Sequence, residues 1–254
     1  MPSPRRTALA ILLLAAAPCV SAQTTERFAL RGRPQELHIL GPEQGPPALV
    51  SSGDGGWIHL GPRVGDLLAA RGYSVVGFDV KHYLSSFTQE GKTLATSDVS
   101  ADYRTLVENA RRGRDARVIL VGVSEGAGLS VLAASDRTLA PLLEGVVALG
   151  LPASNELGWR FCDSLIYFTK KTPKEPTFRT SDYLGALADV PLAALHSTHD
   201  EYVALEEVQR LMAQPGGRKR LWVVPAENHA FQGDNGFFER SLNEALGWIR
   251  SERR

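Results

Sequence analysis

The chain has 254 residues, of which 43% are apolar and 22% are charged, a composition too apolar for an intrinsically disordered protein. Its 28 basic and 28 acidic residues balance, which argues against a protein that binds nucleic acid mainly through bulk positive charge. Two cysteines are too few for a disulfide scaffold, and the length is typical of one or two domains.

Residues 1–22 have the pattern of a secretory signal peptide. Arg5 and Arg6 form a short positive region, residues 8–17 are an unbroken apolar run, and residues 20–22 resemble a cleavage site of small residues. The apolar run is too short to cross a bilayer core, which needs about 20 residues. We therefore expect cleavage after export and a periplasmic protein.

Cleavage would leave residues 23–254 as the mature chain. Without Arg5 and Arg6 its formal charge is −2, and Cys162 remains as its only cysteine. A disulfide within the mature chain is therefore excluded, although an exported protein meets conditions that permit one. No stretch rich in Pro, Gly or Ser divides the chain, so we expect a single domain.

Strand-like and helix-like patterns alternate along the mature chain. Apolar runs typical of strands lie at residues 28–30, 36–40, 47–52, 73–80, 117–121, 145–151, 191–196 and 221–224. Helical patterns lie at residues 64–68, 99–110, 126–134, 203–212 and 238–249. The first two strands are expected to pair antiparallel at one edge. The alternation predicts an α/β fold with a mostly parallel central sheet and helices on both faces.

Residues 152–190 depart from this rhythm. They lie between two predicted strands, show weak periodicity, and are rich in basic and aromatic residues between positions 158 and 183. We interpret them as a lid inserted over the sheet. An ordinary charged surface with core aromatics is the alternative.

A candidate nucleophile lies in Gly122-Val123-Ser124-Glu125-Gly126, which matches G-x-S-x-G. A buried strand precedes the motif and a helix of small residues follows it, as the nucleophile elbow of a hydrolase requires. The tight turn presents the serine hydroxyl at the helix N-terminus, where developing negative charge is favoured. We therefore predict Ser124 as the nucleophile; a structural Gly-Ser turn is the alternative.

An acid and then a base are expected after the serine. His229 follows the strand at 221–224 and is the candidate base. Asp200 follows the strand at 191–196 and is the candidate acid, with Glu201 and Asp234 as rivals. In the triad, Ser124 attacks, the histidine carries the proton, and the acid orients the imidazole.

Two backbone N–H groups are expected to form an oxyanion hole. The first belongs to Glu125, directly after the nucleophile. The second belongs to the glycine-rich loop after the strand at 47–52, where Asp54 is favoured and Gly55 is the second choice. Gly56 and Trp57 of the same loop are predicted to contact substrate.

No metal or cofactor is expected. His59, His82 and His199 lie in separate loops without a short ligand spacing such as H-x-x-x-H. The chain also has no glycine-rich phosphate loop and no dinucleotide fingerprint.

The run Ser52-Gly53-Asp54-Gly55-Gly56-Trp57, with G-x-S-x-G downstream, resembles the virulence-associated VirJ/AcvB family of α/β-hydrolases. The resemblance covers about residues 30–250 and matches the short, single-domain form. It implies a periplasmic α/β-hydrolase, with Ser124, Asp200 and His229 as the triad. It also implies hydrolysis of aminoacylated phosphatidylglycerol and a link to type IV secretion and virulence.

An aminoacyl ester of phosphatidylglycerol carries a phosphate, acyl chains and a cationic amine. The basic and aromatic residues of the insertion, Tyr167 and Lys170 among them, are predicted to face phosphate and lipid, with peripheral membrane contact. Asp54 or Glu125 is predicted to receive the amine. The alternatives are a general carboxylesterase or thioesterase acting on a small-molecule ester, and a non-enzymatic factor that binds secretion-system proteins.

Overall fold

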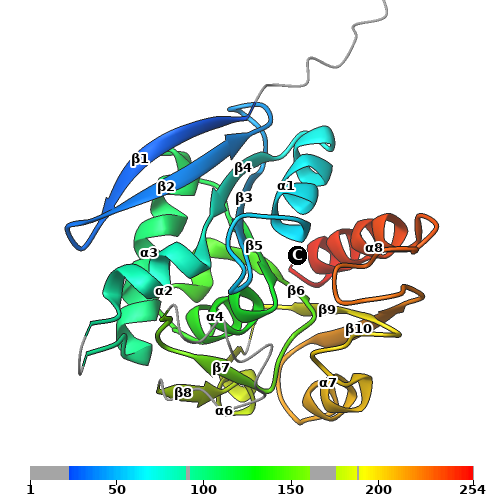
Figure 1. Ribbon diagram of the computed structural model, residues 1–254. Coiled ribbons are helices and arrows are strands. Elements are labelled where there is room, and N and C mark those ends of the chain that lie inside the picture. The colour runs from blue at the N-terminus through cyan, green and yellow to red at the C-terminus, as the bar shows by residue number, and fades with distance from the viewer. Residues whose placement is uncertain (1–22, 90–91, 161–175, 188, 254) are drawn as a thin grey trace, which may run out of the picture.

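The computed structural model describes residues 23–89, 92–160, 176–187 and 189–253. The predicted signal peptide, residues 1–22, lies outside the described residues. Figure 1 shows a central twisted sheet with helices packed on both sides.

Eight strands form this sheet, in the order β1-β2-β4-β3-β5-β6-β9-β10. The strands are β1 (Thr24–Leu30), β2 (Arg33–Leu40), β3 (Pro47–Ser51), β4 (Ser74–Phe78), β5 (Val118–Val123), β6 (Leu143–Leu149), β9 (Leu192–Ser197) and β10 (Lys219–Val224). Every neighbouring pair from β4 to β10 is parallel. The antiparallel β1–β2 pair forms one edge, as predicted, and β2 joins β4 antiparallel.

Helices cover the two faces unequally (Figure 1). One face carries α1 (Leu60–Ala70) and α8 (Phe237–Glu252), which share an apolar core. The other carries α2 (Val80–Phe87), α3 (Thr96–Arg111) and α4 (Glu125–Ala134), which share a second core. Because both faces are covered, β3, β4 and β5 are buried along their whole length, which is typical of parallel strands.

The predicted helical faces are confirmed where the periodicity is strong. In α3 the face formed by Val99, Tyr103, Leu106, Val107 and Ala110 is buried throughout. In α8 the buried residues are Phe238, Leu242, Ala245, Leu246 and Ile249. Among the described residues, every helix is too short or too polar to span a bilayer.

The sequence pattern missed α2. The strand predicted at 73–80 ends at Phe78, because the carboxylate of Asp79 accepts the His82 N–H and caps a new helix from Val80. This junction lies at the carboxyl end of β4, the edge of the sheet where α/β folds place their ligand sites.

The described part of residues 152–190 is not a simple loop. It contains the antiparallel pair β7 (Ser154–Glu156) and β8 (Thr177–Arg179), followed by α6 (Ser181–Leu184) and the 3-10 turn η3 (Gly185–Leu187). The lid interpretation of the whole segment stays a prediction, since part of it lies outside the described residues. The remaining elements are the 3-10 turn η1 (Ala140–Leu142) and α7 (Leu205–Met212).

Candidate active site

Ser124 occupies a strained turn between β5 and α4. Its φ of 49° and ψ of −117° are unfavourable for a residue with a side chain. The Ser124 N–H donates to the Leu149 carbonyl at 2.8 Å, which ties the turn to the end of β6. The strained backbone is the conformation that a nucleophile elbow requires.

The glycines of the motif make this turn sterically feasible. A Cβ on Gly122 would lie 2.3 Å from the Gly126 carbonyl oxygen. A Cβ on Gly126 would lie 2.3 Å from the carbonyl oxygen of Ser52. Glycine at these two positions of the motif therefore allows strand, helix and neighbouring loop to pack with their backbones in direct contact.

Asp200 and His229 are in direct contact through a short hydrogen bond. The distance from His229 Nδ1 to Asp200 Oδ2 is 2.6 Å, and the Asp200 side chain is 1% exposed. The other carboxylate oxygen accepts the N–H groups of Tyr202 at 3.0 Å and Val203 at 2.9 Å. These bonds hold the carboxylate in one orientation, facing the imidazole.

The same contacts set the protonation of Asp200. Burial alone would raise the pKa of this carboxyl group. The hydrogen bond and charge of His229, together with the two backbone N–H groups, outweigh burial and hold the pKa below its usual value. The Asp200 carboxylate is therefore ionised at neutral pH and can accept the Nδ1 proton of His229.

Among the described residues, neither rival acid, Glu201 or Asp234, is hydrogen-bonded to the imidazole ring of His229. Glu201 accepts the backbone N–H of His229 at 2.7 Å. Asp234 pairs with Arg63 at 3.1 Å and accepts the Phe238 N–H at the start of α8. Glu201 thus supports the histidine loop, and Asp234 supports a helix.

A second histidine lies behind the pair and was missed in the sequence. His196, at the end of β9, is fully buried, and its Nε2 donates to the Val203 carbonyl at 3.0 Å. Its Nδ1 lies 3.9 Å from Asp200 Oδ2. Burial lowers the pKa of His196, so it is neutral beside the carboxylate.

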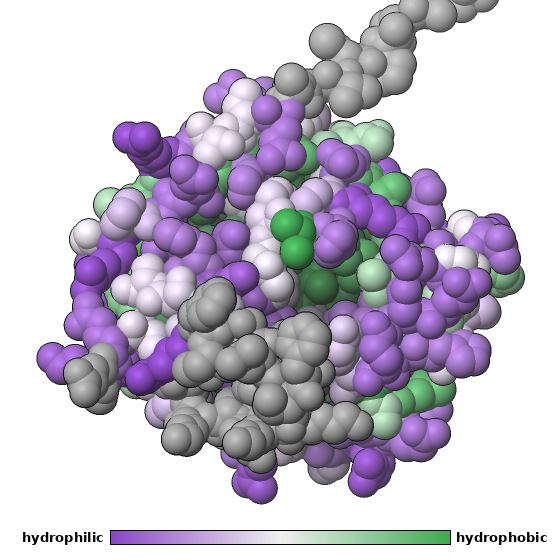
Figure 2. Space-filling view, in the orientation of Figure 1, coloured by the Kyte–Doolittle hydropathy of each residue, from purple (hydrophilic) through white to green (hydrophobic). Residues whose placement is uncertain are grey.

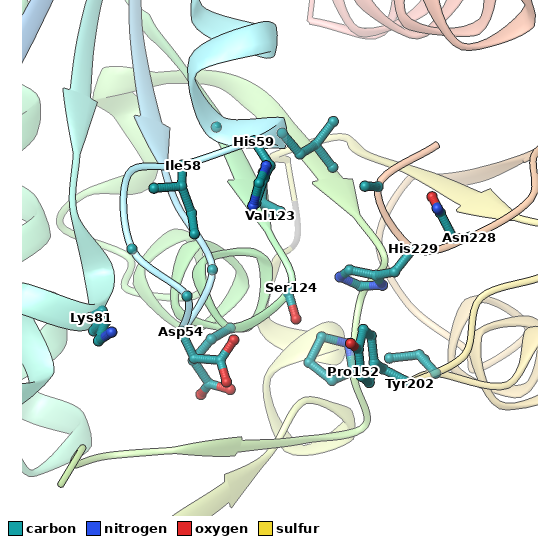
Figure 3. A pocket seen from close by; sticks show the side chains of 18 of the residues that line it. Asp54, Ile58, His59, Lys81, Val123, Ser124, Pro152, Tyr202, Asn228 and His229 are labelled. Carbon is teal, nitrogen blue, oxygen red and sulfur yellow. The ribbon is translucent and has the colours of Figure 1, made fainter. Parts of the chain in front are cut away.

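Ser124 and His229 line one cavity of about 690 Å³. Figure 3 shows the serine hydroxyl pointing into this space, with the imidazole on the neighbouring wall. Ile58 and Tyr202 also line the cavity and are 52% and 61% exposed. The Tyr202 ring lies edge-on to His229, with centroids 5.4 Å apart. In Figure 2 the face carries a recess with apolar residues inside a largely hydrophilic surface.

The loop of residues 53–57, which we name the oxyanion loop after its predicted role, lies against Ser124. A Cβ on Gly53 would be 3.4 Å from Ser124 Cβ, and Gly56 closes a turn by donating to the Gly53 carbonyl at 3.0 Å. Asp54, Gly55 and Gly56 line the cavity. The structure thus places the loop that carries the predicted donors beside Ser124, the predicted nucleophile.

Glu125 supplies the other predicted donor and an unusual carboxyl group. It is the first residue of α4, so its N–H has no acceptor within the helix. Its carboxylate accepts the Glu156 N–H at the start of the β7–β8 region. Burial raises the pKa of the Glu125 carboxyl group well above its usual range, and the nearby charges of Glu156 and Asp54 raise it further.

One wall of the cavity is therefore rich in carboxyl groups. Asp54, Glu125 and Glu156 all line it, together with Lys81, whose Nζ lies 4.6 Å from the centre of the Trp159 ring. Glu156, Lys81 and Trp159 were not singled out in the sequence, because no motif marks them.

Trp57 does not lie where substrate binding was predicted. It is absent from the cavity lining; its indole packs where a Cβ on Gly77 would lie 2.2 Å from the ring, and it stacks on His38 with centroids 4.7 Å apart. A glycine in β4 makes room for the ring, so Trp57 anchors the loop from below. Tyr167 and Lys170 lie outside the described residues.

The three histidines considered as metal ligands lie apart. His59 lines the cavity, whereas His82 contacts the Pro34 carbonyl and His199 the Ala226 carbonyl. Across the described ranges, no three His, Cys, Asp or Glu side chains come together as a metal site.

Residues 47–147 match the family of the bacterial virulence protein VirJ. The VirJ match extends from β3 into β6 and includes the oxyanion loop and Ser124. Asp200 and His229 lie beyond it. The resemblance inferred from S-G-D-G-G-W and G-x-S-x-G is confirmed over this segment. A comparison with curated proteins gives no match.

Solved structures confirm the α/β-hydrolase fold. Est1E from Butyrivibrio proteoclasticus is 13% identical, with a TM-score of 0.64 over 90% of this chain and 98% of its own. The Pyrococcus furiosus esterase Pf2001 is 16% identical, with a TM-score of 0.65 over 89% of this chain and 90% of its own. A membrane phospholipase A described as a bacterial virulence factor is 13% identical, with a TM-score of 0.65 over 90% and 87%.

Proposed function

We propose that the protein is an exported serine ester hydrolase with the triad Ser124, His229 and Asp200. The observation that carries the proposal is the 2.6 Å contact of His229 with a buried carboxylate, at the cavity that a strained serine also lines. This combination of a nucleophile, a base and an orienting acid is the arrangement that activates a serine hydroxyl. The match to VirJ and the esterase neighbours support the same chemistry.

Catalysis would proceed through an acyl-enzyme. Ser124 Oγ attacks the ester carbonyl carbon while His229 Nε2 takes the hydroxyl proton. The tetrahedral oxyanion accepts hydrogen bonds from the Glu125 N–H and from the N–H of Asp54 or Gly55. The intermediate then expels the alcohol, which takes the proton from His229. A water molecule, activated by the same histidine, releases the acid. Each oxyanion donor contributes about 3 kcal/mol to transition-state stabilisation.

We further propose that the substrate is aminoacyl-phosphatidylglycerol, cleaved at its aminoacyl ester in the periplasm. The resemblance to the VirJ/AcvB family implies this substrate, and the carboxyl-rich wall of the cavity beside Ser124 supports it. The ammonium group of the aminoacyl moiety would donate to the carboxyl oxygens of Asp54 and Glu156. The exposed apolar side chains of Ile58 and Tyr202 at the cavity mouth would meet the lipid part.

A general carboxylesterase or thioesterase is the second candidate, favoured by the esterases among the structural neighbours.

Purified protein, with Ser124→Ala as the control, should be incubated with a fluorophosphonate probe, short p-nitrophenyl esters and aminoacyl-phosphatidylglycerol vesicles. Labelling of the wild type alone would support the triad. Hydrolysis of the lipid well above that of simple esters would support the lipid substrate.

Two results would count against these proposals. A folded wild-type protein that the probe does not label would overturn the hydrolase. Unchanged aminoacyl-lipid levels in a deletion strain would overturn the lipid substrate. Full complementation of the strain by Ser124→Ala would favour a non-enzymatic VirJ-like role with secretion-system partners.

A further inference from the structure

The oxyanion loop has to hold its backbone N–H groups in place while negative charge develops on the substrate. Such donors work only when their positions are set before the reaction, because they then need no reorganisation. Three of the five loop residues are glycine, and Gly56 has a φ of +96°, so the loop's own conformational preferences are weak. Contacts from outside the loop must therefore determine its shape.

Asp79 provides such a contact at the end of the loop. Its Oδ2 accepts the Trp57 N–H at 3.1 Å. Its Oδ1 accepts the His82 N–H at 2.9 Å, which is the cap of α2. One carboxylate thus joins the loop to the first turn of a helix whose core side is buried.

Gly56 shows how closely the loop approaches this carboxylate. A Cβ on Gly56 would lie 3.2 Å from Asp79 Oδ2 and 3.4 Å from Oδ1. The loop therefore passes directly over the carboxylate between the turn that faces Ser124 and the Trp57 N–H. Figure 3 shows this loop passing beside the serine.

The start of the loop is held by the same junction. Ser52 donates its N–H to the Phe78 carbonyl at 3.0 Å, and its hydroxyl accepts the Val80 N–H at 3.0 Å. Residues on both sides of Asp79 thus hold one end of the loop, and Asp79 itself holds the other. The Trp57 ring packs against Gly77 and blocks movement of the loop toward the sheet.

We infer that Asp79 is the positioning residue of the oxyanion hole. It does not reach the cavity lining and acts through the Trp57 N–H, which determines where the Asp54 and Gly55 N–H groups point. This inference rests on the proposed function, because it assigns Asp79 a role in the reaction of Ser124. Its loss should weaken binding of the tetrahedral oxyanion more than binding of the ester itself.

The test compares Asp79→Ala and Asp79→Asn with the wild type on p-nitrophenyl butyrate. An alkyl trifluoromethyl ketone, which forms an anionic tetrahedral adduct with a serine, reports on the oxyanion hole. For Asp79→Ala we expect kcat to fall about 10- to 100-fold, less than the complete loss of a donor. The inhibitor Ki should rise in parallel, while KM changes by less than about threefold. Asp79→Asn keeps one acceptor oxygen and should lie between alanine and wild type.

Asp136→Ala is the matched control for lost stability. Asp136 also accepts a backbone N–H, that of Thr138 at 2.7 Å, and it follows α4 at the end far from Ser124. This variant should lose thermal stability without loss of kcat. Hydrogen exchange of peptides covering residues 53–58 should accelerate in Asp79→Ala and not in the control.

The outcomes separate this inference from the proposed function. An active wild type whose Asp79 variants retain kcat and Ki, or lose only thermal stability as the control does, overturns the role of Asp79 alone. A folded wild type that neither hydrolyses esters nor reacts with a fluorophosphonate overturns the proposed function and the inference with it.

Discussion

The two halves of the site hold their chemical groups by different means. The half within residues 47–147 positions Ser124 and the oxyanion loop through backbone shape: a strained φ, glycines in close contact, and N–H groups at a helix start. The half built on β9 and β10 positions Asp200 and His229 through side-chain hydrogen bonds and burial. A required backbone shape is visible in the sequence as glycines at set positions, whereas a side-chain pair between distant residues has no local sequence pattern. The VirJ match covers the first half and ends before Asp200 and His229.

The largest effect is expected from removing the proposed nucleophile. Ser124→Ala should lower kcat by about 10⁶-fold, the effect measured for a serine of this kind. The fold should persist, because within the described residues the Ser124 hydroxyl makes no hydrogen bond that caps α4. Ester hydrolysis and fluorophosphonate labelling would measure the loss, and circular dichroism would check the fold. Substantial residual turnover would point to another nucleophile.

Removing the charge of Asp200 tests the other half. Asp200→Asn should lower kcat by about 10⁴-fold, since the amide favours the wrong imidazole tautomer. Glu201→Gln is the matched control, because Glu201 contacts the His229 backbone and not the ring. Glu201→Gln should lower kcat far less than Asp200→Asn does. Equal losses in both variants would contradict the assignment of the acid.

A methyl group placed in the first half should act through sterics alone. Gly126→Ala places a Cβ 2.3 Å from the Ser52 carbonyl oxygen, and we expect about 1–3 kcal/mol lower unfolding free energy, with reduced activity. Gly247→Ala, within α8 and with no atom in reach of a Cβ, is the control. It should be neutral or stabilising by up to about 1 kcal/mol. Urea titrations would give both values.

The smallest expected effects concern pH and have opposite signs in the two halves. The pKa of Asp200 is lowered in the folded protein, so its contribution to stability is present above the unfolded pKa of about 3.9 and is lost as pH falls. The pKa of Glu125 is raised, so stability falls as pH rises above about 4.3 toward the folded value.

Urea unfolding of the wild type, Asp200→Asn and Glu125→Gln across pH would measure these slopes. Asp200→Asn should flatten the acid side of the curve. Glu125→Gln should flatten the side above pH about 4.3 and keep the acceptor for the Glu156 N–H. If Glu125→Gln leaves the curve unchanged, the buried carboxyl group does not titrate as inferred.

Much of the fold was predictable because its signals are local. The alternation of strand-like and helix-like patterns along the chain indicated the parallel sheet. The buried faces of α3 and α8, which the structure confirms, were predicted from the spacing of apolar residues alone. The glycines around Ser124 were equally readable, because a backbone contact that excludes a Cβ demands glycine at a set distance along the chain.

The sequence by itself determined the fold class, the nucleophile motif and the candidates for acid and base. Tertiary structure decided which carboxylate meets the His229 ring, since Asp200 and Glu201 are adjacent and differ only in where their loop points them. The Trp57 side chain, which the sequence placed at the cavity, instead packs against the sheet, where Gly77 makes room. Asp79 contacts the oxyanion loop through the Trp57 N–H. These outcomes depend on contacts between residues 20 or more positions apart, and no periodicity or local motif encodes such contacts.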